Sequence, residues 1–251
     1  MSGRLIILTD LDDTLFASER SLPESLDTAD LIEAAANDQG QAVSWQTVQH
    51  RRLMQALFKD ADVIVPVTGR TSRVLKRVGI LDHDGPAVSS HGGVVLERGR
   101  LVSEWLRRIE ADIAPESQKL EAAMRAIEEA SRALQDAYQP RYRLHEDQGI
   151  PVYASIKTGA EIDRHLSEQI HGIAESHDLY AHVGIRNAAL LPSYTRKDRA
   201  CTFVLDHLLK RTASDTVITL GDSLSDLPFM ALGDFAVQPT QSQIWQTMRT
   251  Y

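Results

Sequence analysis

The sequence predicts an α/β protein: a doubly wound parallel sheet core with a second, α+β domain inserted into it. The first observation is that short apolar runs end abruptly in polar loops, at Arg4–Thr9, Val63–Val67 and Val217–Leu220. Continuous apolar runs of this length are typical of strands buried on both faces. The second observation is that a helix-like stretch follows each run, as in a Rossmann-like fold. Pro66 lacks an amide hydrogen and is therefore expected at the end of its strand.

The first polar loop reads Asp10-Leu11-Asp12-Asp13-Thr14-Leu15. Ligands in doubly wound sheets bind just beyond the carboxyl ends of the strands, so this loop is expected at a functional edge. Two acids that are two residues apart can point the same way out of that edge. The alternative is a solvated turn in which Asp13 or Thr14 caps a helix.

The segment Ala17–Gln46 lies between the first strand and the next helix. It contains a predicted turn, Asn37-Asp38-Gln39-Gly40, flanked by the apolar stretches Leu31–Ala36 and Ala42–Trp45. We expect either a hairpin or helical flap over the site or an ordinary surface elaboration, and the sequence does not separate the two.

The middle of the chain has its own pattern of strands and helices, which predicts a separate domain at residues 84–191. The core is then discontinuous and consists of residues 1–83 and 192–251. We expect a hairpin of Val88–Leu96 and Leu101–Leu106 across the turn Glu97–Arg100, and strands at Tyr153–Lys157 and His182–Leu191. Apolar residues at helical spacing predict two helices. The first is at Glu116–Tyr138, with Leu120, Met124, Ile127 and Leu134, and the second contains Ile162, Leu166, Ile170 and Ile173.

After the inserted domain, Thr195-Arg196-Lys197-Asp198 reads as a capping box with Thr195 as the N-cap. This places Lys197 in the first turn of a helix, beside its positive end. The third apolar run is followed by Gly221-Asp222-Ser223-Leu224-Ser225-Asp226, which brings two more acids to a strand end.

These motifs resemble, in order, the four signatures of the haloacid dehalogenase superfamily. Asp10-Leu11-Asp12-Asp13-Thr14 resembles hhhDxDxT, and Val67-Thr68-Gly69-Arg70 resembles the second signature, an apolar strand ending in Thr or Ser. Lys197 resembles the lysine of the third, and Gly221–Asp226 resembles the GDxxxD of the fourth. The insertion looks like a type-two (C2B) cap. In layout the chain is similar to sucrose-phosphate, trehalose-phosphate, mannosyl-phosphoglycerate and Cof-type phosphatases and to eukaryotic phosphomannomutase.

The resemblance implies roles for the acids. Asp10 is expected to attack phosphorus and form an aspartyl-phosphate, and Asp12 to act as general acid and then base. The expected metal is Mg²⁺, held by the carboxylates of Asp10 and Asp222 and the backbone carbonyl of Asp12. Asp226 is expected either to ligate the metal or to hold the ligands in place.

The same resemblance implies groups that bind the phosphoryl oxygens and the rest of the substrate. Thr68 offers a hydroxyl, Gly69 an amide hydrogen and Lys197 a positive charge, although Arg196 is an alternative cation. Arg70 is assigned to substrate binding with them. His91, at the hinge into the cap, either touches the leaving group or fills the hinge. Cap positions that could face the non-phosphate part of a substrate are Tyr153, Lys157, Arg186 and Asn187; a solvated strand face explains each of them equally well.

The chain of 251 residues carries a net charge of −8, which argues against a nucleic acid or an anionic membrane as its main partner. Cys201 is the only cysteine, so an intrachain disulfide and a cysteine-based zinc site are excluded. No apolar stretch reaches membrane-spanning length, and a cytoplasmic protein is expected.

Together these features predict a Mg²⁺-dependent phosphomonoester hydrolase for a small phosphorylated metabolite, most simply a sugar phosphate. A phosphomutase or a non-catalytic sensor with the same fold are the alternatives. A haloacid dehalogenase fits less well, because that chemistry needs neither Mg²⁺ nor an acid at Asp12. The sequence leaves the oligomeric state and the identity of the substrate open.

Overall fold

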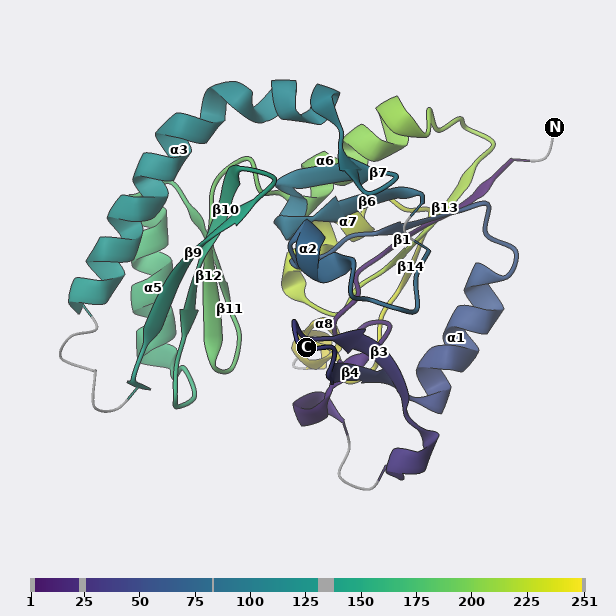
Figure 1. The fold of residues 1–251 in the computed structure, drawn as a ribbon, viewed down its shortest axis with the longest axis horizontal. Coiled ribbons are helices and arrows are strands. Elements are labelled where there is room, and N and C mark those ends of the chain that lie inside the picture. The colour runs from purple at the N-terminus through teal and green to yellow at the C-terminus, as the bar shows by residue number, and fades with distance from the viewer. Residues whose placement is uncertain (1–2, 23–25, 83, 131–137, 250–251) are drawn as a thin grey trace. The chain divides into compact units, whose positions relative to one another are not determined.

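The computed structural model describes residues 3–22, 26–82, 84–130 and 138–249. The chain divides into two compact units, one formed by residues 1–102 and 197–251 and the other by residues 103–196 (Figure 1). The first unit is therefore discontinuous in sequence, and we refer to the two as the core unit and the inserted unit.

A parallel four-stranded sheet lies at the centre of the core unit. Its strands follow the order β14-β13-β1-β5, with β1 at Leu5–Thr9, β5 at Val63–Pro66, β13 at Thr216–Leu220 and β14 at Phe235–Val237. Ile6, Ile7 and Leu8 of β1 are completely buried, as predicted for a strand covered on both faces. The predicted parallel α/β core is confirmed, and Pro66 is the last residue of β5.

The helices of the core unit connect these strands. Among the described residues they are α1 (Val48–Phe58), α2 (Ser72–Leu75), α6 (Lys197–Phe203) with a π-helical continuation at Val204–Leu208, α7 (Leu227–Met230) and α8 (Gln243–Met248), together with 3₁₀ turns at Glu19–Ser21, Thr28–Asp30, Ser90–Gly92 and Leu224–Asp226.

The segment after the first loop forms a small antiparallel sheet in the order β2-β4-β3, with β2 at Ala17–Ser18, β3 at Ile32–Ala36 and β4 at Ala42–Gln46. The β3–β4 hairpin turns at Asn37–Gly40, where the sequence predicted a turn. Asp38 at its tip forms salt bridges with Arg73 and Arg77. The hairpin is thereby tied to the α2 region of the core.

A second small sheet, β6-β7-β8, consists of Pro86–Ser89, Val94–Glu97 and Arg100–Leu101. The β7–β8 turn falls where the sequence predicted it, but the strand expected over Leu101–Leu106 is wrong beyond Leu101. Helix α3 begins at Ser103 instead, because Trp105 and Ile109 continue the apolar period of a helix. Val88 pairs with Val67 next to β5, so contacts group residues 84–102 with the core unit rather than with the insertion.

The inserted unit is an antiparallel sheet with two helices on one face. The order is β11-β12-β10-β9, and the elements are α3 (Ser103–Ala130), β9 (Arg141–Asp147), β10 (Ile150–Lys157), α5 (Arg164–Ser176), β11 (Tyr180–Val183) and β12 (Asn187–Leu191). The strand expected at His182–Leu191 is in fact a hairpin of two strands, and β9 was not predicted. The helix expected at Glu116–Tyr138 starts earlier, and residues 131–137, including Leu134, lie outside the described residues.

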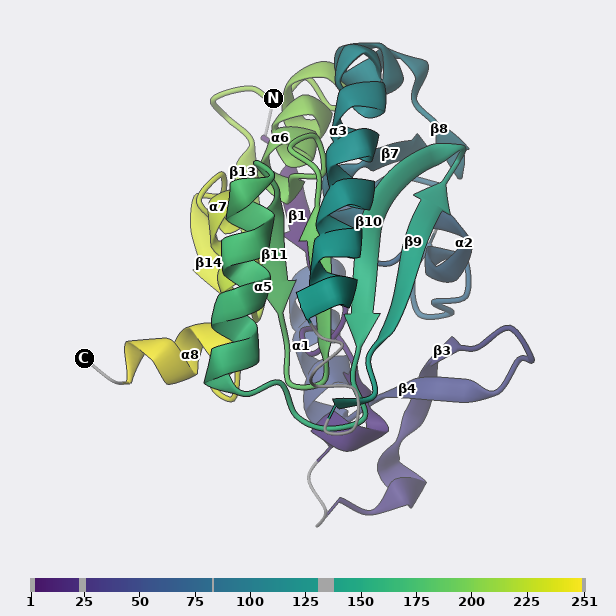
Figure 2. The same ribbon diagram turned by 90° about the vertical axis from the view of Figure 1, so that its left-hand side faces the viewer.

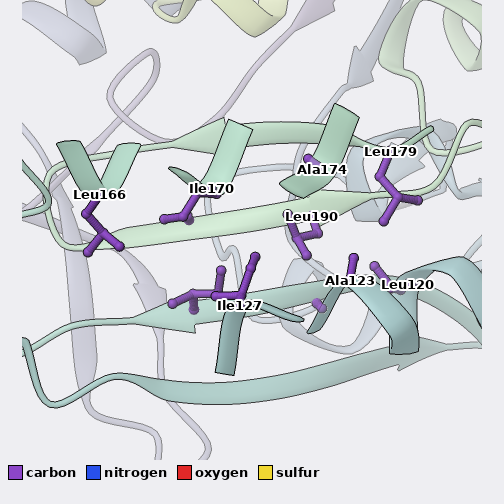
Figure 3. Close-up of a cluster of buried hydrophobic side chains, with 11 residues drawn as sticks. Leu120, Ala123, Ile127, Leu166, Ile170, Ala174, Leu179 and Leu190 are labelled. Carbon is purple, nitrogen blue, oxygen red and sulfur yellow. The ribbon is translucent and has the colours of Figure 1, made fainter. Parts of the chain in front are cut away.

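Helices α3 and α5 cover the same face of this sheet (Figure 2). Leu120, Ala123 and Ile127 of α3 pack toward Leu166 and Ile170 of α5 in one apolar cluster (Figure 3). Alternate residues of the sheet complete the cluster, namely Ala154, Ile156, Ala188 and Leu190. The apolar periodicity that predicted both helices is therefore the contact surface of this layer.

Among the described residues, no helix combines the length and the apolar character needed to cross a membrane.

Candidate active site

Three loops of the core unit begin at neighbouring strand ends. The amide of Asp10 donates to the carbonyl of Leu220 at 2.9 Å, and the amide of Val67 donates to the carbonyl of Thr9 at 2.7 Å. These bonds continue the parallel pairing of β1 with β13 and β5 into the loops. The sheet itself therefore gathers the acids that the sequence placed at its edge.

Lys197, the first residue of α6, lies between two carboxylates of different loops. Its Nζ is 2.7 Å from Oδ1 of Asp10 and 2.6 Å from Oδ1 of Asp226, and only 9% of its side chain is exposed. Arg196, the alternative cation, lies over the ring of Tyr180 in the inserted unit instead. Lys197 is therefore the cation at the acid cluster.

Thr195, the expected N-cap of this helix, precedes the first helical residue by two positions. Its hydroxyl donates to the carbonyl of Pro192 at 2.8 Å. The placement of Lys197 in the first helical turn agrees with the sequence prediction, and the turn at Pro192–Thr195 leads the chain into it.

Asp226 is completely buried and holds the last loop in place. Its Oδ2 accepts hydrogen bonds from the amide and hydroxyl of Ser223, at 3.0 and 2.7 Å, and from the amide of Asp222 at 3.3 Å. Its Oδ1 accepts from Lys197. With both oxygens engaged, Asp226 fits the positioning role that the sequence weighed against direct metal ligation.

The carboxylates of Asp10, Asp222 and Asp226 offer oxygen atoms that all lie within 4.8 Å of one another. Thr14 connects two of them, because its hydroxyl is 3.5 Å from Oδ2 of Asp10 and 3.4 Å from Oδ1 of Asp222. Hard oxygen donors at this spacing suit Mg²⁺. The donor set therefore fits the metal that the sequence motifs imply.

The pKa values of the clustered acids also favour a bound cation. Burial, followed by the neighbouring charges of Asp226 and Asp13, raises the pKa of Asp222 to about 7. Burial is also the main cause that raises the pKa of Asp10 well above its ordinary value. The Asp226 carboxyl is buried as well, yet the charge of Lys197 holds its pKa below the usual range. The charge of Lys197 thus stabilises the ionised form of Asp226, whereas Asp10 and Asp222 keep raised pKa values. These two carboxylates favour the binding of a further cation.

Asp12 lies apart from this cluster and is bound by Arg70. Nε of Arg70 is 2.8 Å from Oδ2 of Asp12, and Nη2 is 2.6 Å from Oδ1. Arg70 is itself held by the hydroxyl of Ser44, on strand β4, at 3.3 Å and lies over the ring of Phe16. Arg70, which the sequence assigned to substrate binding, therefore orients Asp12 in this structure.

The loop that contains Thr68 and Gly69 packs against the 3₁₀ turn that contains His91. The amide of His91 donates to the carbonyl of Thr68 at 3.0 Å, and the amide of Ser90 donates to the carbonyl of Arg70 at 2.8 Å. Ser90 and His91 both adopt left-handed backbone conformations, with φ of 51° and 56°. The imidazole of His91 occupies the space where a Cβ on Gly69 would lie. Only glycine fits this position, and consecutive left-handed residues mark a strained segment.

Lys157 and Arg186 belong to the inserted unit. The two lie near each other, since the amide of Thr158 donates to the carbonyl of Arg186 at 3.0 Å, and both side chains are exposed.

Sequence reasoning missed three side chains that support the acids: Thr14, Ser44 and Ser223. Thr14 and Ser223 lie within the motifs Asp10–Thr14 and Gly221–Asp226. Their closeness in sequence to the acids is a signal that could have identified them as supporting residues. Ser44 lies in a hairpin without any motif, and its contact with Arg70 depends on the tertiary fold alone.

No protein-family model and no curated protein sequence matches the chain. Solved structures do match it along nearly its whole length. The sucrose-phosphatase of Synechocystis sp., in complex with sucrose and phosphate, is 14% identical with a TM-score of 0.57, covering 100% of this chain and 97% of that one. The C-terminal domain of the C. albicans trehalose-6-phosphate phosphatase is 16% identical with a TM-score of 0.54, covering 91% and 73%.

A haloacid dehalogenase-like hydrolase of Bacillus subtilis is 16% identical with a TM-score of 0.52, covering 98% of this chain and 85% of that one. At these identities the similarity is one of fold. It agrees with the fold that the four sequence motifs implied.

Proposed function

We propose that this chain, which has the fold of the haloacid dehalogenase-like hydrolases, is a Mg²⁺-dependent phosphomonoester hydrolase acting on a small phosphorylated metabolite. The observation that carries the proposal is the position of Lys197, bound to Asp10 and Asp226 beside Asp222. In this arrangement a carboxylate supplies the nucleophile, and the buried lysine supplies the positive charge that a phosphoryl group needs.

In the first step, a carboxylate oxygen of Asp10 attacks phosphorus and the bond from phosphorus to the leaving oxygen breaks. A proton from the Asp12 carboxyl goes to the leaving oxygen, so the alcohol departs neutral and an aspartyl-phosphate remains. Arg70 engages each oxygen of Asp12 once, which leaves a lone pair on each oxygen for proton transfer.

In the second step, water attacks the phosphorus of the aspartyl-phosphate and Asp12 accepts the proton of that water. The bond between phosphorus and the Asp10 oxygen breaks, inorganic phosphate leaves, and the Asp10 carboxylate is regenerated. Asp12 thereby returns to its protonated form, so the cycle balances.

The remaining groups stabilise charge on the phosphoryl oxygens. Lys197 supplies a positive charge, Thr68 a hydroxyl and Gly69 an amide hydrogen. Mg²⁺, held by Asp10, Asp222 and the backbone carbonyl of Asp12, would screen the repulsion between the attacking carboxylate and the phosphate. Asp226 and Thr14 would keep these ligands in position.

A sugar phosphate is the substrate class that we favour. The fold is shared with a sucrose-phosphatase and a trehalose-6-phosphate phosphatase, which supports this class without identifying its member. We further propose that the protein acts in the cytoplasm.

The test is release of inorganic phosphate from p-nitrophenyl phosphate, followed by a panel of sugar phosphates. We expect turnover with Mg²⁺ and none after chelation by EDTA. Folded protein that releases no phosphate from any of these compounds would contradict the proposal and favour a non-catalytic role. Isomerised sugar phosphate formed without stoichiometric phosphate would instead identify a phosphomutase.

A further inference from the structure

A run of basic residues follows strand β5, and of these only Arg70 has a role in the proposed active site. Between residues 63 and 81 the sequence has four arginine or lysine residues and no acidic residue, although the whole chain carries a net charge of −8. Arg73 lies in α2, and Lys76 and Arg77 follow directly after that helix. We call Arg73, Lys76 and Arg77 the basic turn. Such a local excess of positive charge in an acidic chain indicates a place where an anion can bind.

The two arginines of the basic turn converge on a single carboxylate oxygen. Nη2 of Arg73 donates to Oδ1 of Asp38, at the tip of the β3–β4 hairpin, over 3.0 Å. Nη1 of Arg77 donates to the same oxygen. One position in space therefore lies within hydrogen-bond distance of two guanidinium groups. The oxygen of any other anion placed there would meet the same two charged donors.

The backbone around Arg77 is fixed by strand β3 and not by the hairpin tip. The amide of Arg77 donates to the carbonyl of Val74 at 3.1 Å, and its carbonyl accepts from the amide of Ala36 at 3.2 Å. The amide of Gly79 donates to the carbonyl of Ala34 at 2.9 Å. These bonds remain when the Asp38 carboxylate leaves its position. An anion that binds there therefore does not have to order the backbone that carries Arg77.

Asp38 compensates the charge of the basic turn only in part. Within the described part of the chain it is the one acid in a salt bridge with Arg73 or Arg77, so one negative charge is set against two positive charges. The Nε of Arg77 is buried and has no hydrogen-bond partner. The Asp38 side chain is 56% exposed and that of Arg73 is 79% exposed. Ion pairs this exposed contribute little to stability, because water and salt screen them, so an anion of higher charge can displace Asp38.

We propose that Arg73 and Arg77 form a binding site for a phosphate group, in which a phosphate oxygen takes the place of Oδ1 of Asp38. A phosphate group carries up to about twice the charge of a carboxylate and offers more acceptor oxygens to the two guanidinium groups. Lys76, which is exposed and lies between the two arginines in sequence, adds a third positive charge. The group belongs either to inorganic phosphate or to a phosphorylated metabolite. The site uses no residue of the acid cluster around Lys197 and does not depend on the hydrolase activity proposed above.

The direct test is an NMR titration of the full chain that follows the Nε–H signals of its arginines, with that of Arg77 assigned by Arg77→Lys. The signal of Arg70, whose Nε–H is bonded to Asp12, serves as the reference for the active site. The probes are inorganic phosphate, glycerol 3-phosphate and acetate, in EDTA and at constant ionic strength. We expect phosphate to half-saturate the shift of Arg77 at a concentration at least about tenfold below that of acetate, the gain from one additional charge-assisted hydrogen bond.

Three variants, each checked for folding by its melting temperature, test the residues of the site. Arg73→Gln should weaken phosphate binding at least about tenfold, because one of the two donors is lost. Asp38→Asn should bind phosphate about fivefold more tightly, because no carboxylate has to be displaced. The matched control is Arg125→Gln, which removes an exposed arginine paired with Glu121 and should bind like the wild type. Equal affinity for phosphate and acetate would overturn the proposal, and so would an unchanged phosphate affinity in Arg73→Gln or in Asp38→Asn.

The same titration separates the two sources of the phosphate group. Tighter binding of glycerol 3-phosphate than of inorganic phosphate identifies a phosphorylated metabolite as the ligand, and the reverse order identifies free phosphate. If phosphate shifts the signal of Arg70 and leaves that of Arg77 unchanged, the anion binds at the active site alone and the proposal is wrong. Absence of phosphate release in the hydrolysis assay would contradict the proposed function only, because the titration involves no turnover.

Discussion

The guanidinium of Arg70 holds the carboxylate of Asp12 through two parallel hydrogen bonds, at 2.8 and 2.6 Å. Paired bonds of this kind fix the orientation of a carboxylate as well as its position. Ser44 and Phe16 in turn fix Arg70, so the hairpin after the first loop contributes to the orientation of Asp12. The segment Ala17–Gln46, whose role the sequence left undecided, thus helps to position Asp12, the proposed general acid and base.

Replacing Arg70 should therefore reduce kcat more than it raises KM for p-nitrophenyl phosphate. We expect a loss on the order of 10²-fold for Arg70→Gln, within the range that general acid–base catalysis contributes. Arg70→Lys should be intermediate, because an ammonium group cannot form both parallel bonds. A wild-type kcat in Arg70→Gln would contradict a positioning role.

Asp10→Asn should abolish turnover while the protein stays folded. We expect a loss of at least about 10³-fold, since the variant lacks the nucleophile. Burial already raises the pKa of Asp10, so a neutral side chain of the same shape is tolerated there. Phosphate release and circular dichroism are the two measurements, and retained turnover would show that Asp10 is not the nucleophile.

Lys197→Met should destabilise the fold as well as inactivate it. Removing one partner of a buried ion pair costs about 3–5 kcal/mol, because the other charge is left uncompensated. Urea unfolding measures the loss. Arg164→Met, which removes an exposed pair with Glu168, is the control and should cost less than about 1 kcal/mol.

Magnesium should stabilise the protein more at pH 8 than at pH 6. The pKa of Asp222 is about 7 without metal, so at pH 6 the cation must displace a proton from this carboxyl. Without metal, the raised pKa makes a contribution to stability that is full below pH 3.8 and is lost as the pH rises through 7. Melting temperatures with and without Mg²⁺ test this. Asp222→Asn should abolish the metal effect and Asp178→Asn should not; a shift independent of pH would argue against Asp222 as a ligand.

A methyl group at Gly69 should disturb the turn that carries Thr68. Its Cβ would overlap the imidazole of His91, and overpacking of this kind costs about 1–3 kcal/mol. The double variant G69A/H91A should recover most of that loss, measured as the free energy of unfolding. If the double variant is as unstable as Gly69→Ala, the strain lies in the backbone and not in the contact with His91.

The sequence was informative where one physical signal dominated. Buried parallel strands read as apolar runs, so β1, β5 and β13 and the loops after them could be located, and with them the acids. Strand β9 escaped because Arg141, Arg143 and Glu146 leave it without an apolar run. The start of α3 was misread because Leu101, Val102, Trp105 and Leu106 suit either a strand or a helix over so short a window.

The candidate site was predictable in its acids but not in its supporting contacts. Lys197 could be placed because the motif and the helix start coincide. The binding of Arg70 to Asp12 could not be read from the chain, since it depends on a hairpin that has no motif. The resemblance to capped phosphatases, together with their charge, suggested Lys157 and Arg186 as binding residues, but only the strand register places Lys157 opposite Arg141.

The position of β1 in its sheet also determines the order in which the protein can fold. Leu5 pairs with Thr216, so the central strand meets one neighbour only after most of the chain has been synthesised. The strands of the inserted unit pair with partners that are close in sequence. Local pairings form faster than distant ones. The inserted unit is therefore expected to fold on the ribosome first. Until β13 has been synthesised, the edge of β1 that pairs with it stays exposed and can aggregate.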